Sequence, residues 1–533
     1  MTRSSFTNKP HITSVGEIVP TAGQLPKGGI CPDALCLRNG RAAPLAALPA
    51  MSFARFSQWL SEQIGAGCRA VAFFAVPRES ASALRTAPPL FLLYAVLADD
   101  VAGLLLAART EIGSSYPSLT PDIAALHLFE RVLYEKFAIL PEGHPWLKPV
   151  RFDNPAGPGV GEMNFYRIDG DEVHEVAVGP IHAGVIECGH FRFQCLGEEV
   201  LYLEISLGYH HRGVEAMLTG GPLARILPLI ETVAGDSTAA HAFACCTLLE
   251  GLSETLPSPR GQHIRALALE LERLACHTGD IGAIAGDVGF LPTSAFCGRL
   301  RGDWLNMSAM LCGSRFSRGL FVSGGTAFDL DPALAHVLTD KVVLAARDVQ
   351  GAVRLIWNSP SVMARLTGIG VLPASVAASL GVVGPPARAS GLARDARRSH
   401  PLPCLPALEK ICVADRGDVG DRTALRYDEA LASAALCQNI LKDLPAGGCR
   451  AEKQEKIYAL APKHIAVALV EGWRGEVCHV ALTDEFGHFA AYSIVDPSFH
   501  NWAGLAYALR RQQISDFPLC NKSFNLSYCG HDL

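Results

Sequence analysis

Two long amphipathic stretches, residues 260–280 and 421–441, most constrain what this chain can fold into. Apolar or small residues of the first stretch recur at alternating steps of three and four, at Ile264, Leu267, Leu271, Leu274 and Thr278. That spacing places them on one face of an α-helix, which Gly279 is positioned to end. Helices of this kind pack against one another. The sequence therefore predicts a helix bundle that can hold a site in its core.

The first third of the chain has a mixed pattern. Residues 53–64 have helical spacing, residues 70–76 are typical of a strand, and residues 90–97 and 103–110 pair as strands around an Asp99-Asp100 turn. These segments predict a small α+β domain.

A helix is expected to close this domain. Thr120 is a good N-cap, and Pro121 suits the first helical position. The apolar stripe of this helix comprises Ile123, Leu126, Phe129, Leu133 and Phe137.

The expected fold class is α+β: a small N-terminal α/β domain, then a mainly helical large domain with a central bundle and a β-rich N-terminal part. Residues 1–45 show no sustained period and read as a loosely attached arm, while 151–162 have the Pro/Gly density of a linker. Between and after these lie the small domain, 46–150, and the large domain, 163–533. Residues 380–406, with five prolines and four arginines, are expected to be a long loop that is either a solvated face or a functional segment.

Composition excludes some classes of protein. The net charge of −6 and the lack of a basic, aromatic-interleaved patch disfavour nucleic-acid binding. The N-terminus is polar and does not resemble a secretory signal. The most apolar window, residues 90–108, is interrupted by Asp99 and Asp100, so no transmembrane span is expected. The 17 cysteines are scattered and are expected to be reduced thiols.

Metal ligation by paired cysteines has no support in the spacing, because the chain contains no C-x-x-C motif. Cys245 and Cys246 are adjacent and would point apart on a helix. Cys520 and Cys529 are too far apart to form one knuckle. We expect all four to be packing residues.

Histidines and one arginine are the remaining candidates for chemistry. His182 and His190 share the stretch GPIHAGVIECGHFRF, and His241 follows small residues that permit close backbone approach. Arg474, between Trp473 and Gly475, is either stacked and paired inside a cleft or part of a salt bridge at a hairpin edge.

The C-terminal residues 516–533, DFPLCNKSFNLSYCGHDL, alternate apolar and polar side chains without a polar tail or linker. We expect them to fold back and complete a buried site.

Taken together, eight blocks across about residues 160–533 resemble a known family. They are GPIHAGVIECGHFRF, YHHRGVE, RALALELERLACHTGDIGAIAGDVGF, CGSRFSRGLFVSGG, GPPARASGLARDARRSHP, GDVGDRTALRYDEAL, VEGWRGEVCHV and DPSFHNW. This order resembles the large subunit of energy-converting nickel-iron hydrogenases and equally the quinone-site subunit of respiratory complex I. Upstream, YPSLTPDIAALHLFERVLYEKFAILPEGHP is similar to the small subunit that complex I places beside it, so the chain resembles a fusion of the two.

The resemblance also identifies departures. The hydrogenases hold nickel and iron on four cysteines, and the matching positions here carry Ala234, Ser237, Ser527 and Gly530. The complex I relatives hold the quinone headgroup with a histidine, matched by His182, and a tyrosine, which residues 234–240 lack.

The positions that match the family's cleft are the candidate catalytic residues. They are His182, His190, His241, Arg474 and Asp532, with Asp496 and Ser498 beside them. The tail is expected to lie beside residues 234–241 and beneath the His182 loop.

The resemblance implies a subunit of a membrane-associated, ion-translocating oxidoreductase complex on the cytoplasmic face of the cell membrane. Its expected partners are an iron-sulfur subunit, a membrane-anchor subunit and ion-antiporter-like membrane subunits. No cofactor is expected in this chain; iron-sulfur clusters belong to the partner, and the acceptor is a quinone or an unknown molecule. The alternative is a non-catalytic adaptor with an inert cleft, and an active hydrogenase is disfavoured.

Overall fold

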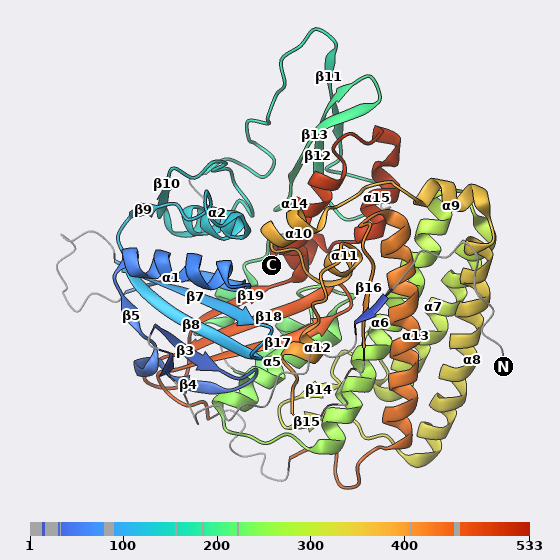
Figure 1. Ribbon diagram of the computed structural model, residues 1–533. Helices are drawn as coiled ribbons and strands as arrows, with labels where there is room; N and C mark the ends of the chain where they lie inside the picture. The colour runs from blue at the N-terminus through green and yellow to red at the C-terminus, as the bar shows by residue number, and fades with distance from the viewer. Residues whose placement is uncertain are drawn as a thin grey trace.

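The computed structural model describes residues 13–15, 30–31, 33–78, 90–154, 157–183, 186–220, 223–403, 405, 408, 410–451 and 459–533. Two sheets lie side by side on one flank of the molecule and a helix bundle forms the other flank (Figure 1). A third, small sheet projects above them, and the C-terminus lies near the centre (Figure 1). This arrangement agrees with the expected α+β class.

The N-terminal sheet has the strand order β2-β3-β8-β7-β6, with β5 also paired to β8. Its strands are β2 (Ile30–Cys31), β3 (Ala34–Leu37), β5 (Ala50–Met51), β6 (Arg69–Pro77), β7 (Phe91–Asp99) and β8 (Leu104–Ile112). Helix α1 (Phe53–Gly65) begins at Ser52, whose side chain accepts a hydrogen bond from the Arg55 N–H. The strands, the helix and the β7–β8 turn predicted from the sequence are confirmed.

The predicted N-terminus of the closing helix is wrong. Helix α2 (His127–Phe137) begins seven residues after Thr120 and is preceded by a short 3-10 turn, η2 (Ala124–Leu126). The Thr120 hydroxyl instead donates to the buried carboxylate of Glu130 at 2.6 Å, and the Thr120 N–H donates to the same oxygen at 3.1 Å. Thr120, which has the residue type of an N-cap, therefore makes a tertiary hydrogen bond to Glu130 instead of capping the helix.

The second sheet, in the order β19-β18-β17-β4, combines the two ends of the chain. It contains β4 (Ala42–Pro44), β17 (His464–Gly472), β18 (Gly475–Thr483) and β19 (Phe489–Val495). The Asn39 side chain reinforces this pairing, since it donates to the carbonyl of Leu469 at 2.8 Å and accepts from the Leu469 N–H at 2.8 Å. Residues 34–44, within the expected arm, therefore form strands in both sheets, while residues 1–12 and 16–29 of that arm lie outside the described residues.

The two sheets share one hydrophobic core. Residues of β6, β7 and β8 belong to the same buried cluster as Ile465, Val467 and Leu469 of β17 and Val480 of β18. On its other side the second sheet packs against α5 (Thr238–Leu252), which is buried along nearly its whole length. Because burial surrounds the second sheet, its strands are almost continuously apolar rather than alternating.

Four long helices that pack against one another form the predicted bundle: α6 (Pro259–Asp287), α7 (Leu291–Cys312), α8 (Pro332–Trp357) and α13 (Val419–Lys442). Helices α6 and α13 contain the two predicted stretches. Gly279 does not end α6, which continues to Asp287. A Cβ on Gly279 would lie 2.7 Å from the Arg301 Cδ of α7, so this glycine permits close packing instead of a cap.

The third sheet consists of β11 (Val173–Val178), β12 (His190–Leu196) and β13 (Glu199–Ser206). It packs on the C-terminal helices α14 (Pro497–Ala508), α15 (Phe517–Phe524) and α16 (Tyr528–Asp532).

The remaining elements are β1 (Thr13–Val15), η1 (Leu45–Ala47), β9 (Ser115–Pro117), β10 (Leu140–Glu142), α3 (Val214–Leu218), η3 (Leu223–Arg225), α4 (Ile226–Ile230), β14 (Phe321–Val322), β15 (Gly325–Thr326), α9 (Pro360–Leu366), α10 (Ala374–Ser379), α11 (Gly384–Ala389), α12 (Ala396–Ser399), β16 (Ile411–Val413) and η4 (Ile514–Asp516).

The expectation of a solvated loop at 380–406 is wrong for its described part. The segment forms α11 and α12 and runs through the interior. Arg388 is fully buried and pairs with Glu429 and Glu471, each at 2.7 Å. Paired carboxylates from α13 and β17 thus draw this arginine inward.

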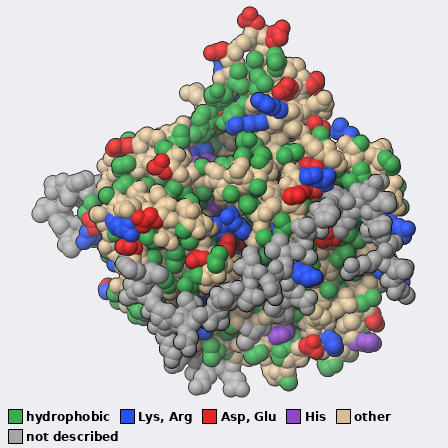
Figure 2. Space-filling model, in the orientation of Figure 1, with side chains coloured by type: hydrophobic (Ala, Val, Ile, Leu, Met, Phe, Trp, Pro, Cys, Tyr) green, Lys and Arg blue, Asp and Glu red, His purple; other side chains and the backbone are tan. Residues whose placement is uncertain are grey.

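Acidic and basic side chains are interspersed over the face shown in Figure 2, and the described part of that face carries no extended basic patch. None of the helices in the described residues combines the length and apolarity needed to cross a bilayer.

Candidate functional site

The C-terminal tail inserts between the β17–β18 turn, helix α14 and the loop before β12, and it lines one pocket together with Gly235 and Asp236 of the loop before α5. The Arg474 Nε donates to the carbonyl of Asn525 at 2.6 Å, and the Tyr528 N–H donates to the Glu187 carboxylate at 3.2 Å. The Ser527 N–H donates to the Ser498 hydroxyl at 2.8 Å. The tail therefore lies where it was expected, with its backbone bonded to three separate segments.

Arg474 is the best-anchored cation of this region. Its two terminal nitrogens, Nη1 and Nη2, lie 2.5 and 2.8 Å from the two oxygens of Asp236. Nη1 also donates to the Ser237 hydroxyl at 3.1 Å, and the guanidinium stacks 3.9 Å from the Trp473 ring centroid. Burial disfavours the charge, but the Asp236 carboxylate outweighs it and raises the pKa of Arg474. The cleft alternative for Arg474 holds, rather than the hairpin-edge salt bridge.

His241 belongs to a buried chain of hydrogen bonds behind Arg474. Its Nε2 lies 3.0 Å from Asp496 Oδ2, and its Nδ1 lies 3.1 Å from His479 Nε2. His479 Nδ1 in turn lies 2.9 Å from the Tyr492 hydroxyl. Burial, followed by the neighbouring His241, lowers the pKa of His479 well below its usual value, so this ring is neutral. The chain links the tail to β19 through groups that can donate and accept protons.

His182 and His190 lie together but apart from Arg474. His182 Nε2 lies 2.8 Å from the carbonyl of Gly189, and His190 Nδ1 lies 3.2 Å from the carbonyl of Gly179. The ring of His182 faces Phe191, with centroids 5.9 Å apart. The two histidines thus fasten the loop before β12, and the tail contacts this loop through Glu187.

Asp532 anchors the end of the tail. Its two oxygens accept hydrogen bonds from the N–H groups of Gly208 and His210, both at 2.9 Å, and His531 Nδ1 lies 2.8 Å from it. Its side chain is fully buried. With every oxygen used by the fold, Asp532 positions the tail.

The residues at the four metal-ligand positions do not fit a nickel-iron centre. None offers a thiolate, which such a centre needs. The Ser237 hydroxyl is bonded to Arg474, and the Ser527 hydroxyl caps α16 by accepting from the Gly530 N–H at 2.9 Å. At Gly530 an added Cβ would lie 2.5 Å from the Asp496 Cγ, so Asp496 fills the space a ligand side chain would need.

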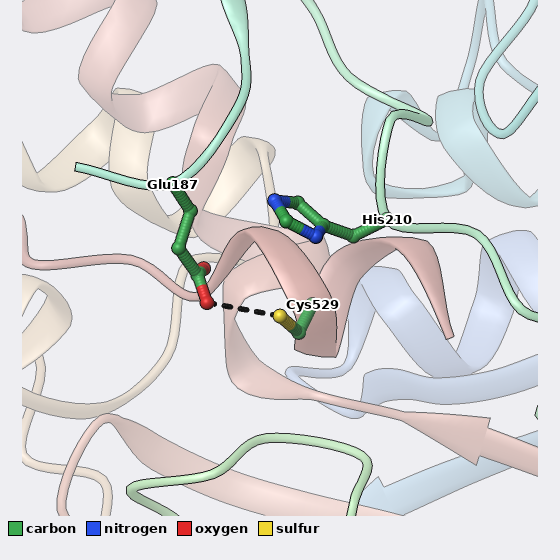
Figure 3. Close-up of side chains that lie close together, drawn as sticks. All are labelled: Glu187, His210 and Cys529. Atoms are coloured by element: carbon green, nitrogen blue, oxygen red, sulfur yellow. Dashed lines mark hydrogen bonds between the residues drawn. The ribbon is translucent and has the colours of Figure 1, made fainter. Parts of the chain in front are cut away.

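Glu187, His210 and Cys529 form a second group beside the tail, with one potential ligand atom of each within 4.8 Å of the others (Figure 3). The Cys529 thiol donates to Glu187 Oε1 at 2.9 Å, and the Cys188 N–H donates to His210 Nε2 at 3.1 Å. Burial and Glu187 raise the pKa of Cys529 to about 12, which keeps the thiol protonated. Cys520 is fully buried as predicted, whereas Cys529 makes this polar contact and is not simply a packing residue.

A pocket of about 530 Å³ opens where these segments meet. We call it the tail pocket. Asp236, Arg474, Asn525, Ser527 and Tyr528 contribute to its wall, together with Glu187 and residues of α7, α15 and the loop after α7. Of the predicted cleft residues, Arg474 lines this pocket, and His241 and Asp496 lie directly behind it.

Several residues of the site were missed from the sequence. Asp236 stands in the stretch already compared with the metal motif, so its position between Ala234 and Ser237 was a usable signal. His479 gave none, since 238 residues separate it from His241. Arg301, which lines the tail pocket, lies in a helix with no distinguishing local pattern, whereas Arg318 stands in the block CGSRFSRGLFVSGG, so its position was a usable signal.

Comparison with known proteins agrees with this architecture. Residues 287–532 match the family described as respiratory-chain NADH dehydrogenase, 49 kDa subunit. The carbon monoxide-induced hydrogenase of Rhodospirillum rubrum is 30% identical over 356 residues, which cover 66% of this chain and 97% of that protein. Formate hydrogenlyase subunit 5 of Escherichia coli K12 is 30% identical over 453 residues, covering 80% of this chain and 78% of that protein.

Among solved structures, a chain of the membrane-bound sulfane sulfur reductase, an archaeal respiratory membrane complex, has the same fold. Its TM-score is 0.64 at 22% identity, and the match covers 69% of this chain and all of that one (100%). The chain thus belongs to the family that comprises the 49 kDa subunit of complex I and the large subunits of energy-converting nickel-iron hydrogenases.

Proposed function

We propose that this chain is the pocket-bearing subunit of a membrane-associated, ion-translocating oxidoreductase complex. Its relatives are named as subunits of a membrane-bound hydrogenase, a formate hydrogenlyase and NADH-quinone oxidoreductases, which supports this assignment. The chain binds peripherally on the cytoplasmic face of the cell membrane. An iron-sulfur subunit lies on one side of it and a membrane-anchor subunit on the other, with ion-antiporter-like subunits in the membrane.

In this proposal the partner's iron-sulfur clusters supply electrons, and an acceptor, a quinone or another small molecule, receives them in the tail pocket. The observation that carries the proposal is the pairing of Arg474 with Asp236 at the pocket wall, held by the tail and stacked on Trp473. A rigid, charged group of this kind can orient a bound molecule and stabilise charge that develops on it.

In this proposal the hydrogen-bonded side chains of His241, His479 and Tyr492 move protons rather than electrons. It starts at Asp496, which contacts the tail at Gly530, and ends at β19. Burial opposes ionisation of Asp496, but the hydrogen bond with His241 prevails and lowers the pKa of that carboxyl. Asp496 is therefore a ready acceptor of hydrogen bonds beside the pocket.

The alternative function is an adaptor whose pocket is inert. The full neutralisation of Arg474 by Asp236 favours this alternative, because a satisfied ion pair needs no ligand. Arg474→Gln in the purified complex separates the two functions. Electron transfer to an artificial acceptor at the membrane arm should fall at least tenfold if the pocket takes part in turnover.

Arg299→Gln is the matched control, since Arg299 is exposed on α7 and pairs with Asp303 and Asp348. Unchanged turnover in the Arg474 variant, with subunits still assembled, would contradict the redox role and leave the adaptor. Loss of turnover in both variants would point to failed assembly, which size-exclusion chromatography of the two complexes detects.

A further inference from the structure

The tail pocket carries more positive charge than its walls neutralise. Four cationic side chains line it: Arg301 from α7, Arg318 from the following loop, Arg474 from the β17–β18 turn and Lys522 from α15. Its carboxylates are Glu187 and Asp236. Asp236 is used by Arg474, and Glu187 is used by the tail.

Arg301, Arg318 and Lys522 have no carboxylate of the described residues within ion-pair distance. Longer-range attraction reaches Arg318 from Glu231 and Lys522 from Asp287. Three cations thus face one cavity, and only Glu187 opposes them from its wall. Like charges gathered in a concave site repel one another unless an anion lies between them.

A glycine of α6 makes room for Arg301. The stem of Arg301 crosses α6 at Gly279, where an added Cβ would lie 2.7 Å from Arg301 Cδ. Glycine destabilises a helix interior relative to alanine, so its use at 279 favours a packing reason such as this one.

We propose that the tail pocket binds a small dianion, whose carboxylate or phosphate oxygens bridge Arg301, Arg318 and Lys522. Arginine forks match planar oxygen pairs, and lysine adds a point charge. Apart from Tyr528, the apolar side chains of the wall are Ile186, Phe316 and Leu526, which gives little surface for an isoprenoid chain. The inference rests on the proposed function, and it identifies the pocket's ligand as an anionic substrate or effector rather than a quinone.

Calorimetric titration of the assembled complex with malonate, and separately with inorganic phosphate, tests this proposal without any turnover. At least one of the two should bind saturably, and the tighter one identifies the carboxylate or the phosphate source. Arg301→Gln and Arg318→Gln should each weaken that binding at least tenfold, whereas Arg301→Lys should weaken it less. Arg299→Gln, on the same helix but outside the pocket, should bind like the unmodified protein.

The proposal is overturned if neither anion binds saturably, or if Arg299→Gln and Arg301→Gln weaken binding equally. Displacement of the bound anion by a short-chain quinone at lower concentration would also overturn it. A thermal melt without anion checks that the Arg301 and Arg318 variants are folded. Electron transfer without anion binding would refute this inference alone, while anion binding without electron transfer would refute the redox function alone.

Discussion

Arg69 of β6 and Glu476 of β18 form a bidentate ion pair between the N-terminal sheet and the sheet that carries Arg474. The two nitrogen-oxygen distances are 2.5 and 2.8 Å, and both side chains are buried. Asp100 of the β7–β8 turn accepts from the Arg69 Nε at 2.7 Å. One guanidinium therefore bridges two carboxylates at the junction of the two sheets, and His400 Nε2 also lies 3.1 Å from Asp100.

Replacing Arg69 by Met should lower the free energy of unfolding by about 3–5 kcal/mol, because the buried Glu476 would lose its ion-pair partner and Asp100 would keep only His400. Urea unfolding followed by tryptophan fluorescence measures the change. The exposed pair Arg78–Glu111 provides the control, and Arg78→Met should cost under about 1 kcal/mol. A second change, Glu476→Leu, should recover part of the loss in the Arg69 variant. An Arg69 variant as stable as the Arg78 variant would contradict this account.

Buried neutral histidines predict loss of stability in acid. Burial lowers the pKa values of His277 and His500 to about 4. Their folded pKa values lie below the unfolded value of 6.5, so their contribution to stability is complete above that pH and is lost as the pH falls toward 4. When the pH is lowered from 7 to 5.5, each of these histidines should lower the free energy of unfolding by about 1 kcal/mol.

His500→Phe tests the share of one ring. His500 packs against Phe129 and Phe499, with centroids 5.8 and 6.3 Å away, so an apolar ring fits its surroundings. Between pH 7 and 5.5 the free energy of unfolding of the variant should fall by about 1 kcal/mol less than that of the parent protein. Urea unfolding at both pH values measures the difference. Equal pH dependence of the two proteins would show that His500 does not titrate on unfolding in this range.

Asp532→Asn should loosen the tail. The amide can replace one oxygen acceptor but not both, so one of the N–H groups of Gly208 and His210 loses its partner. Hydrogen exchange of residues 525–533 should become at least tenfold faster than in the parent. Asp340→Asn, at a highly exposed position on α8, is the control and should leave this exchange unchanged. Unaltered protection in the Asp532 variant would mean that other contacts hold the tail.

Restoring the four cysteines should not restore a metal centre. A side chain at position 530 collides with Asp496, so Gly530→Ala alone should cost about 1–3 kcal/mol. Gly298→Ala, in α7 with open space at its Cβ, should instead be neutral or stabilising by up to about 1 kcal/mol. The variant with cysteine at 234, 237, 527 and 530 should contain no stoichiometric nickel by elemental analysis. Nickel at one equivalent would contradict this reasoning.

Local signals in the sequence predicted the elements that local physics decides. The apolar spacing of residues 421–441 was enough to predict helix α13. The Asp99-Asp100 turn between two apolar runs was enough to predict the β7–β8 hairpin. Thr120 and Gly279 have the residue types of helix ends, yet each is used for a contact distant in sequence. A capping signal cannot be told from such a contact without the partner.

The site was predictable in its location but not in its interactions. The family resemblance led to Arg474, His241 and the tail, which do meet. The net charge of the tail pocket could not be predicted from the sequence. Arg301 and Arg318 line one pocket only because α7 and its following loop face α15 in the fold. The burial of Arg388 was also not predicted, because an arginine-rich segment is ordinarily solvated. Its ion pairs with Glu429 and Glu471, which are distant in sequence, make the burial favourable.

Asn39 and β4 have a consequence for the order in which the protein folds during synthesis. Asn39 bonds to Leu469, 430 residues later in the chain. At ribosomal rates of about 5–20 residues per second, that interval lasts roughly 20–90 s. During this time β3 can already pair with β8, while β4 has no β17 to join. All strands of the first sheet are thus available to pair long before β17 is made, and β4 stays an unpaired edge segment until residues 464–472 follow.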